Sequence, residues 1–288
     1  MTYAGTLNAV AVAPSAPGNE VPRLLCIGAH PDDSEAFASG LAALWSASGG
    51  LVRFLAMTDG TAGHRESGGA VLARRRQAEA DVAAARVGAD AVILDNQDGA
   101  LMPTLENRHK VIRAIREFQP DVIATHRTND YHPDHRYTGL LVQDSCYMVM
   151  VPNVVPTIAP PAREPIVMYM SDRFSKPGSL QPDLIFDIDS VIEQKLEAMI
   201  AHESQVQEWL PWMSGYLGQL PEEPQARRHF LLSHAEVRSA DEANRFRDAL
   251  VAKYGAERGG AVRYAEAFEL SEYAAALDDE RMKGLFPF

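Results

Sequence analysis

Short apolar runs alternate with longer amphipathic segments from about residue 22 onward. Apolar runs rich in β-branched residues and bounded by turn residues predict buried strands over Arg23–Gly28, Leu51–Met57, Ala91–Leu94 and Asp121–Thr125. Between them, helical spacing of apolar residues predicts helices over Phe37–Ser48, Ala70–Val87 and Asn107–Phe118. This alternation predicts an α/β fold, a Rossmann-like three-layer sandwich with a mostly parallel sheet covered by helices on both faces.

The second half of the chain has a different pattern. A helix is expected over Tyr137–Met150, followed by a proline-rich stretch, Pro152–Pro165, that suits neither a helix interior nor a central strand. Two further strands and two further helices are then predicted, at Ile166–Met170, Leu184–Ile188, Val191–Gln207 and Asp241–Tyr254. We expect residues 151–288 to elaborate the same domain, covering the active edge of the sheet and forming the substrate pocket.

Composition narrows the class of protein. The 288 residues include 27 Lys and Arg and 39 Asp and Glu, so the formal net charge is −12. An acidic chain whose densest basic run is Arg74–Arg76 argues against nucleic acid as a partner, because phosphate contacts need a basic face. A small-molecule ligand is the expected partner, and assembly into a homo-oligomer stays open.

No apolar run approaches the roughly 20 residues that a membrane helix needs. Residues 1–20 contain no Lys or Arg, so they lack the basic start of a signal peptide, and we expect a flexible N-terminal arm there. Cys26 and Cys146 lie inside predicted elements and suit buried free thiols. These features predict a cytoplasmic protein without a membrane partner.

Ligands of parallel α/β folds bind at the carboxyl ends of the strands, and the first predicted strand ends in Ala29-His30-Pro31-Asp32-Asp33-Ser34-Glu35. Pro31 suits the first turn of a following helix. His30 and Asp33 are three residues apart and therefore lie on one side of that turn. Asp32 points elsewhere, about 100° around the helix axis from Asp33. One short segment thus offers two metal ligands and a separate carboxylate.

The fourth predicted strand leads into a second segment of similar composition, Thr125 to Arg136, which contains His132-Pro133-Asp134-His135. Two such loops at one edge of the sheet can converge on one ion, held by His30, Asp33 and His135. Two imidazoles and one carboxylate suit a catalytic Zn²⁺ with an open position for water. Fe²⁺ accepts the same ligands, so the identity of the metal stays open.

The strand followed by AHPDDSE, with HPDHR further along, resembles the PIG-L/LmbE family of metal-dependent de-N-acetylases. Ser34 stands where that family often has Glu, at a position that is not a ligand. The resemblance spans most of residues 23–270 and implies a single LmbE-like α/β domain over residues 21–288. Softer matches lie at Arg76–Glu79, Asp98–Leu101, Lys195, His202–Gln205 and Tyr264–Phe268.

The resemblance also implies roles for individual residues. His30, Asp33 and His135 bind zinc, and Asp32 is the general base. His132 stabilises the oxyanion or acts as general acid, and Asp134 orients and charges it. Arg76 and Asp98 fall where the family contacts its substrate, whereas His202 receives no role.

The function implied first is removal of an N-acetyl group from an amino sugar or sugar conjugate through a zinc-activated water. A second hypothesis is a zinc amidase acting on a thiol conjugate or a natural-product intermediate. A third is a non-catalytic binding protein on the same fold. Trp209, Trp212 and Tyr216 could contact the substrate, or could belong to the core or a subunit interface.

Overall fold

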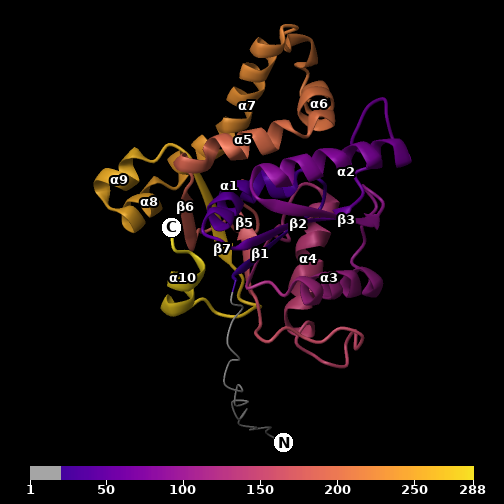
Figure 1. Ribbon diagram of the computed structural model, residues 1–288, viewed down its shortest axis with the longest axis vertical. Helices are drawn as coiled ribbons and strands as arrows, with labels where there is room; N and C mark the ends of the chain where they lie inside the picture. The colour runs from indigo at the N-terminus through magenta and orange to yellow at the C-terminus, as the bar shows by residue number, and fades with distance from the viewer. Residues whose placement is uncertain (1–20) are drawn as a thin grey trace, which may run out of the picture.

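A seven-stranded β-sheet forms the centre of the computed structural model, which describes residues 21–288. Its strand order is β3-β2-β1-β4-β5-β7-β6 (Figure 1). In chain order the strands are β1 (Arg23–Gly28), β2 (Leu51–Thr58), β3 (Ala89–Asn96), β4 (Val122–Thr125), β5 (Ile166–Met170), β6 (Leu184–Asp187) and β7 (Ala265–Leu270). The predicted N-terminal arm, residues 1–20, lies outside the described residues.

Five strands, from β3 to β5, run parallel, and β7 pairs antiparallel with both β5 and β6. The predicted mostly parallel α/β sheet is therefore confirmed. β1 lies between β2 and β4, so the loops that follow β1 and β4 leave neighbouring strands at the same edge. This topology brings the two histidine-containing segments together.

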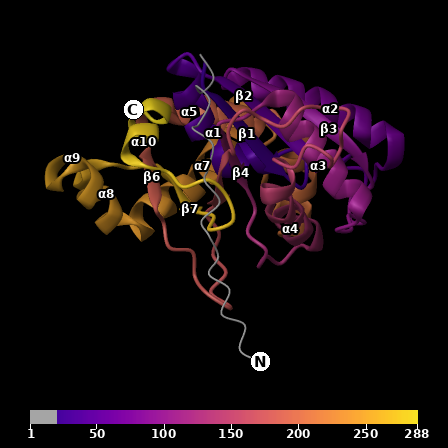
Figure 2. The same cartoon turned by 90° about the horizontal axis from the view of Figure 1, so that it is seen from below.

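Alternating side chains of the strands build two separate cores. Leu24 and Cys26 belong to one core, while Leu25 and Ile27 belong to the other, as the period of two along a strand requires. The first core is covered by α1 (Asp33–Ala47), α2 (Gly69–Arg86) and α5 (Ile192–Ile200), and the second by α3 (Leu105–Phe118) and α4 (Pro133–Met148). Figure 2 shows these layers from below.

The second half of the chain differs most from the sequence-based expectation. It adds β5, β6 and β7 to the sheet, although β7 was not predicted as a strand. The helix predicted over Val191–Gln207 is interrupted: α5 ends at Ile200, and a π-helical turn follows over Ser204–Trp209. The helix predicted over Asp241–Tyr254 is likewise two helices, α7 (Pro224–Arg245) and α8 (Arg247–Tyr254).

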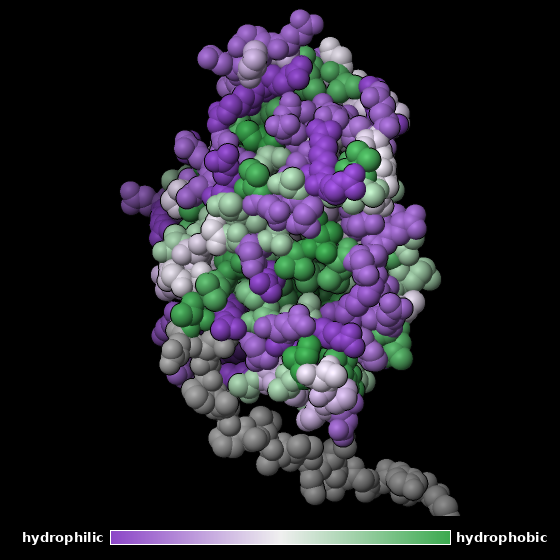
Figure 3. Space-filling view, turned by 45° about the vertical axis from the view of Figure 1, so that its right-hand side comes forward, coloured by the Kyte–Doolittle hydropathy of each residue, from purple (hydrophilic) through white to green (hydrophobic). Residues whose placement is uncertain are grey.

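The remaining helices are short: α6 (Leu210–Met213), α9 (Ala256–Ala261) and α10 (Asp279–Leu285). Figure 1 shows α6 and the start of α7 projecting from the body at the top of the view. Hydrophilic residues cover most of the face in Figure 3, with apolar residues gathered near its middle. Among residues 21–288, no helix has the length and apolar character needed to span a bilayer.

A buried ion pair from the second half is bonded to the backbone of α1. Lys195 Nζ lies 2.8 Å from Glu266 Oε1 and donates to the carbonyl oxygens of Glu35 and Ala36. The carboxylate of Glu266 accepts from the backbone N–H groups of Gly40 and Leu41. Two residues from distant elements thereby fix the helix that follows the first histidine-containing loop.

Candidate active site

The loop after β1 folds around the carboxylate of Asp33. Oδ2 of Asp33 accepts from the backbone N–H groups of Ala29 and His30, at 2.9 and 2.8 Å. Gly28 permits this close approach, because a Cβ atom there would lie 2.7 Å from the Cβ of Asp33. His30 Nδ1 lies 3.5 Å from Asp33 Oδ2, so the structure brings the two predicted ligands together.

The loop after β4 brings the third predicted ligand. α4 begins at Pro133, with His132 at its N-cap, and His135 lies in its first turn. His135 Nε2 is 3.2 Å from His30 Nδ1 and 3.4 Å from Asp33 Oδ1. Ligands of a tetrahedral zinc ion, about 2.0–2.1 Å from the metal, lie about 3.3–3.4 Å apart. The distances from His135 to His30 and to Asp33 are therefore close to the spacing around a divalent cation, and His30 approaches the other carboxylate oxygen of Asp33.

The outer nitrogens of both histidines face carboxylates. His30 Nε2 lies 3.2 Å from Asp98 Oδ1 and 3.4 Å from Asp134 Oδ2, and His135 Nδ1 lies 3.2 Å from Asp130 Oδ1. These are ion-pair distances, although neither ring nitrogen is aligned for a straight hydrogen bond. Carboxylates in this position orient metal-binding imidazoles and raise their basicity.

Electrostatics at the cluster favour a positive charge. Burial opposes protonation of His30, but its carboxylate neighbours, Asp134 first, raise its pKa well above the usual value. The pKa of His135 is also raised, since Asp33 and Asp130 outweigh burial. Burial likewise opposes ionisation of Asp33, yet the adjacent histidines hold its pKa well below the usual range.

His126 is a member of the cluster that the sequence analysis left without a role. Its Nε2 lies 3.1 Å from Asp33 Oδ2, and its ring stacks on that of His135 with centroids 4.1 Å apart. Donor atoms close enough for one ion occur in the group Asp33, His126 and His135 and also in the group His30, His132 and His135. The signal available in the sequence was the position of His126, directly after the end of a buried strand.

Asp32 lies beside the ligands in an unusual backbone conformation, with φ 150° and ψ −19°. Non-glycine residues held in this way are strained and are often found at functional sites. Its side chain makes no cap hydrogen bond to α1, and Oδ1 instead lies 3.2 Å from Nη2 of Arg76. Burial raises the pKa of Asp32, while the positive charge of Arg76 opposes that rise.

The structure gives Asp134 a different partner from the one expected. Its buried carboxylate accepts from the backbone N–H groups of Gly99 and Leu101 and faces His30. Its backbone N–H donates to Nδ1 of His132, 3.2 Å away. Because that bond occupies Nδ1, a neutral His132 carries its proton on Nε2. Burial and the nearby charge of His30 lower the pKa of His132.

Arg76 and Asp98, the expected substrate contacts, are both bound to protein groups. Arg76 is buried and donates to the carbonyl oxygen of Pro31 in addition to its contact with Asp32. Asp98 Oδ2 accepts from the N–H groups of Ala62 and Gly63 in the loop at residues 59–68. Burial would raise the pKa of Asp98, but the close contact with His30 and the N–H groups that its carboxylate accepts from lower it to about 2.

Several softer sequence matches surround this site. His202 is fully buried, and its Nε2 lies 3.1 Å from Glu35 Oε1, close behind the loop that carries Asp32. Gln205, in the π-helical turn, donates to the carbonyl oxygen of Gly63. The second half of the chain therefore contacts both the start of α1 and the loop at residues 59–68.

The aromatic residues noted near α6 contact one another or α7. The rings of Trp209 and Trp212 are stacked with centroids 5.2 Å apart. Tyr216 stacks on His234 of α7, and Trp212 remains 46% exposed. These contacts place the two tryptophans and Tyr216 in the projecting part of the molecule that includes α6 and the start of α7.

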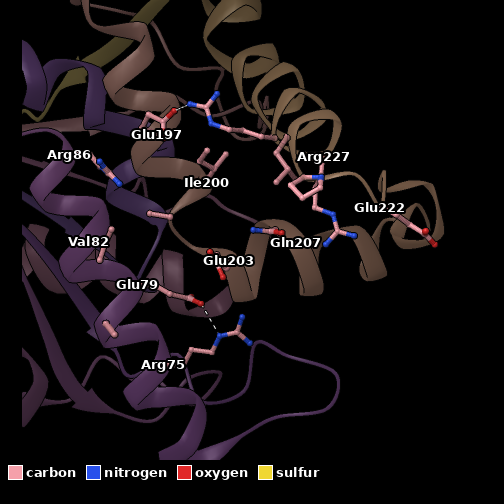
Figure 4. A pocket seen from close by; sticks show the side chains of 15 residues that line it. Arg75, Glu79, Val82, Arg86, Glu197, Ile200, Glu203, Gln207, Glu222 and Arg227 are labelled. Atoms are coloured by element: carbon pink, nitrogen blue, oxygen red, sulfur yellow. Dashed lines mark hydrogen bonds and ion pairs between the residues drawn. The ribbon is translucent and has the colours of Figure 1, made fainter.

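A cleft of about 740 Å³ does not include the histidine cluster. It lies between α2, α5, the π-helical turn and the start of α7 (Figure 4). Positively charged arginine and negatively charged glutamate side chains line the cleft. Several of them form ion pairs with one another, as Arg75 does with Glu79 and Arg228 with Glu197. This cleft therefore lies apart from the candidate site.

Comparisons with known proteins found a matching family and a related protein of described activity. Residues 25–146 match the family described as PIG-L, GlcNAc-PI de-N-acetylase. The chain is 31% identical over 209 residues to a diacetylchitobiose deacetylase of Thermococcus kodakarensis, covering 68% of this chain and 75% of that protein.

Two solved structures share the fold. N,N'-diacetylchitobiose deacetylase from Pyrococcus horikoshii has a TM-score of 0.68 at 24% identity, over 88% of this chain and 85% of that chain. The 4-carboxy-2-hydroxymuconate hydratase of Pseudomonas putida has a TM-score of 0.70 at 18% identity, over 90% of this chain and 99% of that chain. At these identities the likeness establishes the fold alone, and a hydratase among the neighbours shows that this fold does not determine one reaction.

The sheet order and the histidine–aspartate cluster at its carboxyl edge define an α/β protein with a candidate metal centre. The identity with the Thermococcus protein, together with the match at residues 25–146, shows that the chain belongs to the PIG-L family.

Proposed function

We propose that this protein hydrolyses the N-acetyl group of an amino sugar or sugar conjugate with the help of a divalent metal ion. The observation that carries the proposal is the close approach of His30, Asp33 and His135, with the carboxylate of Asp32 beside them. The names of the PIG-L family and of the Thermococcus deacetylase support an N-acetylated sugar as the substrate.

His30, Asp33 and His135 would hold the ion, which we propose to be zinc, with Fe²⁺ as the alternative. A divalent ion bound there polarises the acetyl carbonyl and lowers the pKa of a water molecule toward about 7. Asp130, Asp98 and Asp134 keep the two imidazoles oriented and basic. This assigns Asp134 to His30, in place of the direct action on the His132 ring that the resemblance implied.

Asp32 takes a proton from the attacking water, and Arg76 holds its carboxylate in place. The new carbon–oxygen bond leaves negative charge on the former carbonyl oxygen, and Nε2–H of His132 donates a hydrogen bond to it. Asp32 then returns its proton to the nitrogen as the carbon–nitrogen bond breaks, which gives a free amine and acetic acid, and the acid loses the second proton of the water to solvent to become acetate. Arg76 binds Asp32 and Asp98 binds the loop at residues 59–68, and through these contacts the two residues position the parts of the site that border the substrate.

The experiment removes bound metal with a chelator and adds back Zn²⁺ or Fe²⁺ separately. Acetate release is then measured from N-acetylglucosamine, N,N'-diacetylchitobiose and an N-acetylated cysteine conjugate. We expect no release from the stripped protein and restored release from the sugars. Release from the cysteine conjugate alone supports the thiol-conjugate amidase, and no release from any substrate by metal-loaded protein supports a binding protein. Full activity without metal contradicts the mechanism.

A further inference from the structure

Tyr131 lies beside the proposed metal ligands and has no part in the mechanism above. Its ring meets the rings of His132 and His135 edge-on, with centroids 5.7 and 5.6 Å apart. The residue is 69% exposed. One exposed aromatic residue is ordinary on a protein surface, so exposure alone carries no conclusion. What distinguishes Tyr131 is its position against two imidazoles of the site.

A second aromatic ring from the other half of the chain lies next to it. The ring centroid of Phe174 is 6.2 Å from that of Tyr131, with the two planes inclined by 35°. Phe174 belongs to the segment between β5 and β6 and is half-buried. The two side chains, far apart in the sequence, thus form an aromatic rim at the histidine cluster.

Hydrogen bonds to the backbone N–H and carbonyl groups of Phe174 fix this residue. Its N–H donates to Asp172 Oδ1 at 2.9 Å, and its carbonyl oxygen accepts from Nη2 of Arg127 at 3.0 Å. Arg127 also binds both carboxylate oxygens of Asp172, at 2.7 and 2.8 Å, the bidentate arrangement of a strong ion pair. Asn129 donates to the carbonyl oxygen of Lys176.

These bonds join the segment carrying Phe174 to the segment that supplies His132 and His135. The aromatic rim is therefore set in position before any substrate arrives, which reduces the ordering that binding requires. A flat ligand with an apolar face suits such a rim, because aromatic side chains contribute most when they contact another apolar surface broadly.

We propose that Tyr131 and Phe174 bind the apolar C–H face of a pyranose ring and so make the enzyme specific for N-acetyl groups carried on a sugar ring. This inference rests on the proposed function and adds a specificity site to it. A ring seated against Tyr131 places its substituents next to His132 and His135. Each aromatic contact is expected to change affinity by about two- to tenfold.

The test compares two substrates that carry the same acetamido group and differ in the ring. These are N-acetylglucosamine and its reduced open-chain form, N-acetylglucosaminitol. Wild type is compared with Tyr131→Ala, Tyr131→Phe, Phe174→Ala and Phe174→Leu, all loaded with metal. Both alanine variants should raise KM for the ring substrate by about two- to tenfold and leave kcat nearly unchanged. They should affect the open-chain substrate little, and Tyr131→Phe should behave as wild type.

Two results overturn the proposal. One is an equal loss with both substrates, or a loss of bound metal, because the rings would then serve the histidine cluster and not the sugar. The other is alanine variants that behave as wild type. Phe174→Leu keeps a bulky apolar side chain and so serves as the control for a folding defect. If this variant binds metal normally but no longer prefers N-acetylglucosamine over the open-chain substrate, the result supports contact between the aromatic ring and the sugar.

Binding is measured separately from turnover, so that failure of the proposed function can be recognised. Saturation-transfer NMR reports contact of methyl N-acetylglucosaminide with wild type and with both alanine variants. If wild type releases no acetate yet binds the glycoside, and the alanine variants do not bind it, the aromatic site stands while the hydrolytic function fails. If wild type does not bind the glycoside at all, the aromatic site is refuted.

Discussion

The two halves of the chain complete one sheet but differ in what they contribute to the site. Each proposed metal ligand, together with Asp32 and His132, comes from residues 25–146, the part that matches the family. The part after residue 150 adds β5, β6 and β7 and reaches the site through Lys195, Gln205 and Phe174. The proposed reactive groups thus lie in two short loops, while segments distant in the sequence contact and support those loops.

Buried charges show the same contrast. In the first half, His30 faces Asp33, Asp98 and Asp134, so negative groups outnumber the positive charges there. In the second half, Lys195 and Glu266 compensate each other one to one. An uncompensated buried cluster favours an added cation, whereas a matched pair holds structure together.

The largest expected effect comes from removing a ligand. His135→Ala should abolish metal binding and lower acetate release by about a thousandfold or more, because the ion supplies several kcal/mol of transition-state stabilisation. Metal content by atomic absorption and acetate release are the measurements. His229→Ala, at an exposed histidine of α7, is the matched control and should change neither. Retained metal and activity in His135→Ala would contradict the placement of the metal ligands in the first half of the chain.

Asp32→Asn should separate chemistry from metal binding. We expect it to keep the metal and to lower kcat by about 10²- to 10⁴-fold, the usual contribution of a positioned acid–base group. Asp33→Asn is the comparison, because it should lose metal as well as activity. Equal loss of metal in both variants would make Asp32 a ligand and would remove the general base from the mechanism.

The sequence predicted the first half well, for a physical reason. Strands of a parallel sheet are buried on both faces, so they are short and almost continuously apolar in sequence. For this reason β1, β2 and β4 could be recognised. Their carboxyl ends also located His30, Asp33 and His135 without any knowledge of side-chain contacts. His126 and Asp130 were not assigned roles because no spacing rule applies to them, and their contacts depend on how the loop after β4 turns.

The second half was predicted less well because its elements depend on distant partners. β7, with the sequence AEAFEL, mixes charged and apolar residues, and its Glu266 is buried through its pairing with Lys195. The break between α5 and the π-helical turn follows no periodicity in the sequence. The hydrogen bonds of Ser204 to Glu79, on α2, are visible in the structure alone.

Lys195→Met should reveal how far the second half supports the first. Removing one partner leaves Glu266 buried without its cation, and the free energy of unfolding should fall by about 3–5 kcal/mol. Urea unfolding followed by circular dichroism measures this. The double variant Lys195→Met with Glu266→Gln should recover part of the loss, because no uncompensated charge remains. Unchanged stability in the single variant would show that α1 needs no support from β7.

Asp130→Asn should have a smaller effect, confined to metal affinity. Its carboxylate faces Nδ1 of His135, and loss of such an outer carboxylate typically weakens metal binding by about 10- to 100-fold. Competition with a fluorescent zinc chelator measures the dissociation constant, and excess zinc should restore most of the activity. Asp144→Asn, at an exposed carboxylate of α4, is the control. An affinity equal to that of wild type would leave Asp130 with no part in the metal centre.

The smallest effect is expected at Lys253 of α8, where charge matters to stability and not to the reaction. Burial lowers the pKa of its ammonium group from 10.5 to about 8, and Nζ donates to the carbonyl oxygen of Ile185. Between these two pKa values the unfolded chain binds more protons than the folded one, so Lys253 makes stability rise with pH in that window.

Lys253→Met should flatten this rise. Because Lys253 is exposed to solvent, the change should be modest. Urea unfolding of both proteins from pH 7.5 to 10.5 measures it, and the other titrating groups cancel in the difference. Parallel stability curves would show that the Lys253 ammonium group is as well solvated in the folded protein as in the unfolded chain.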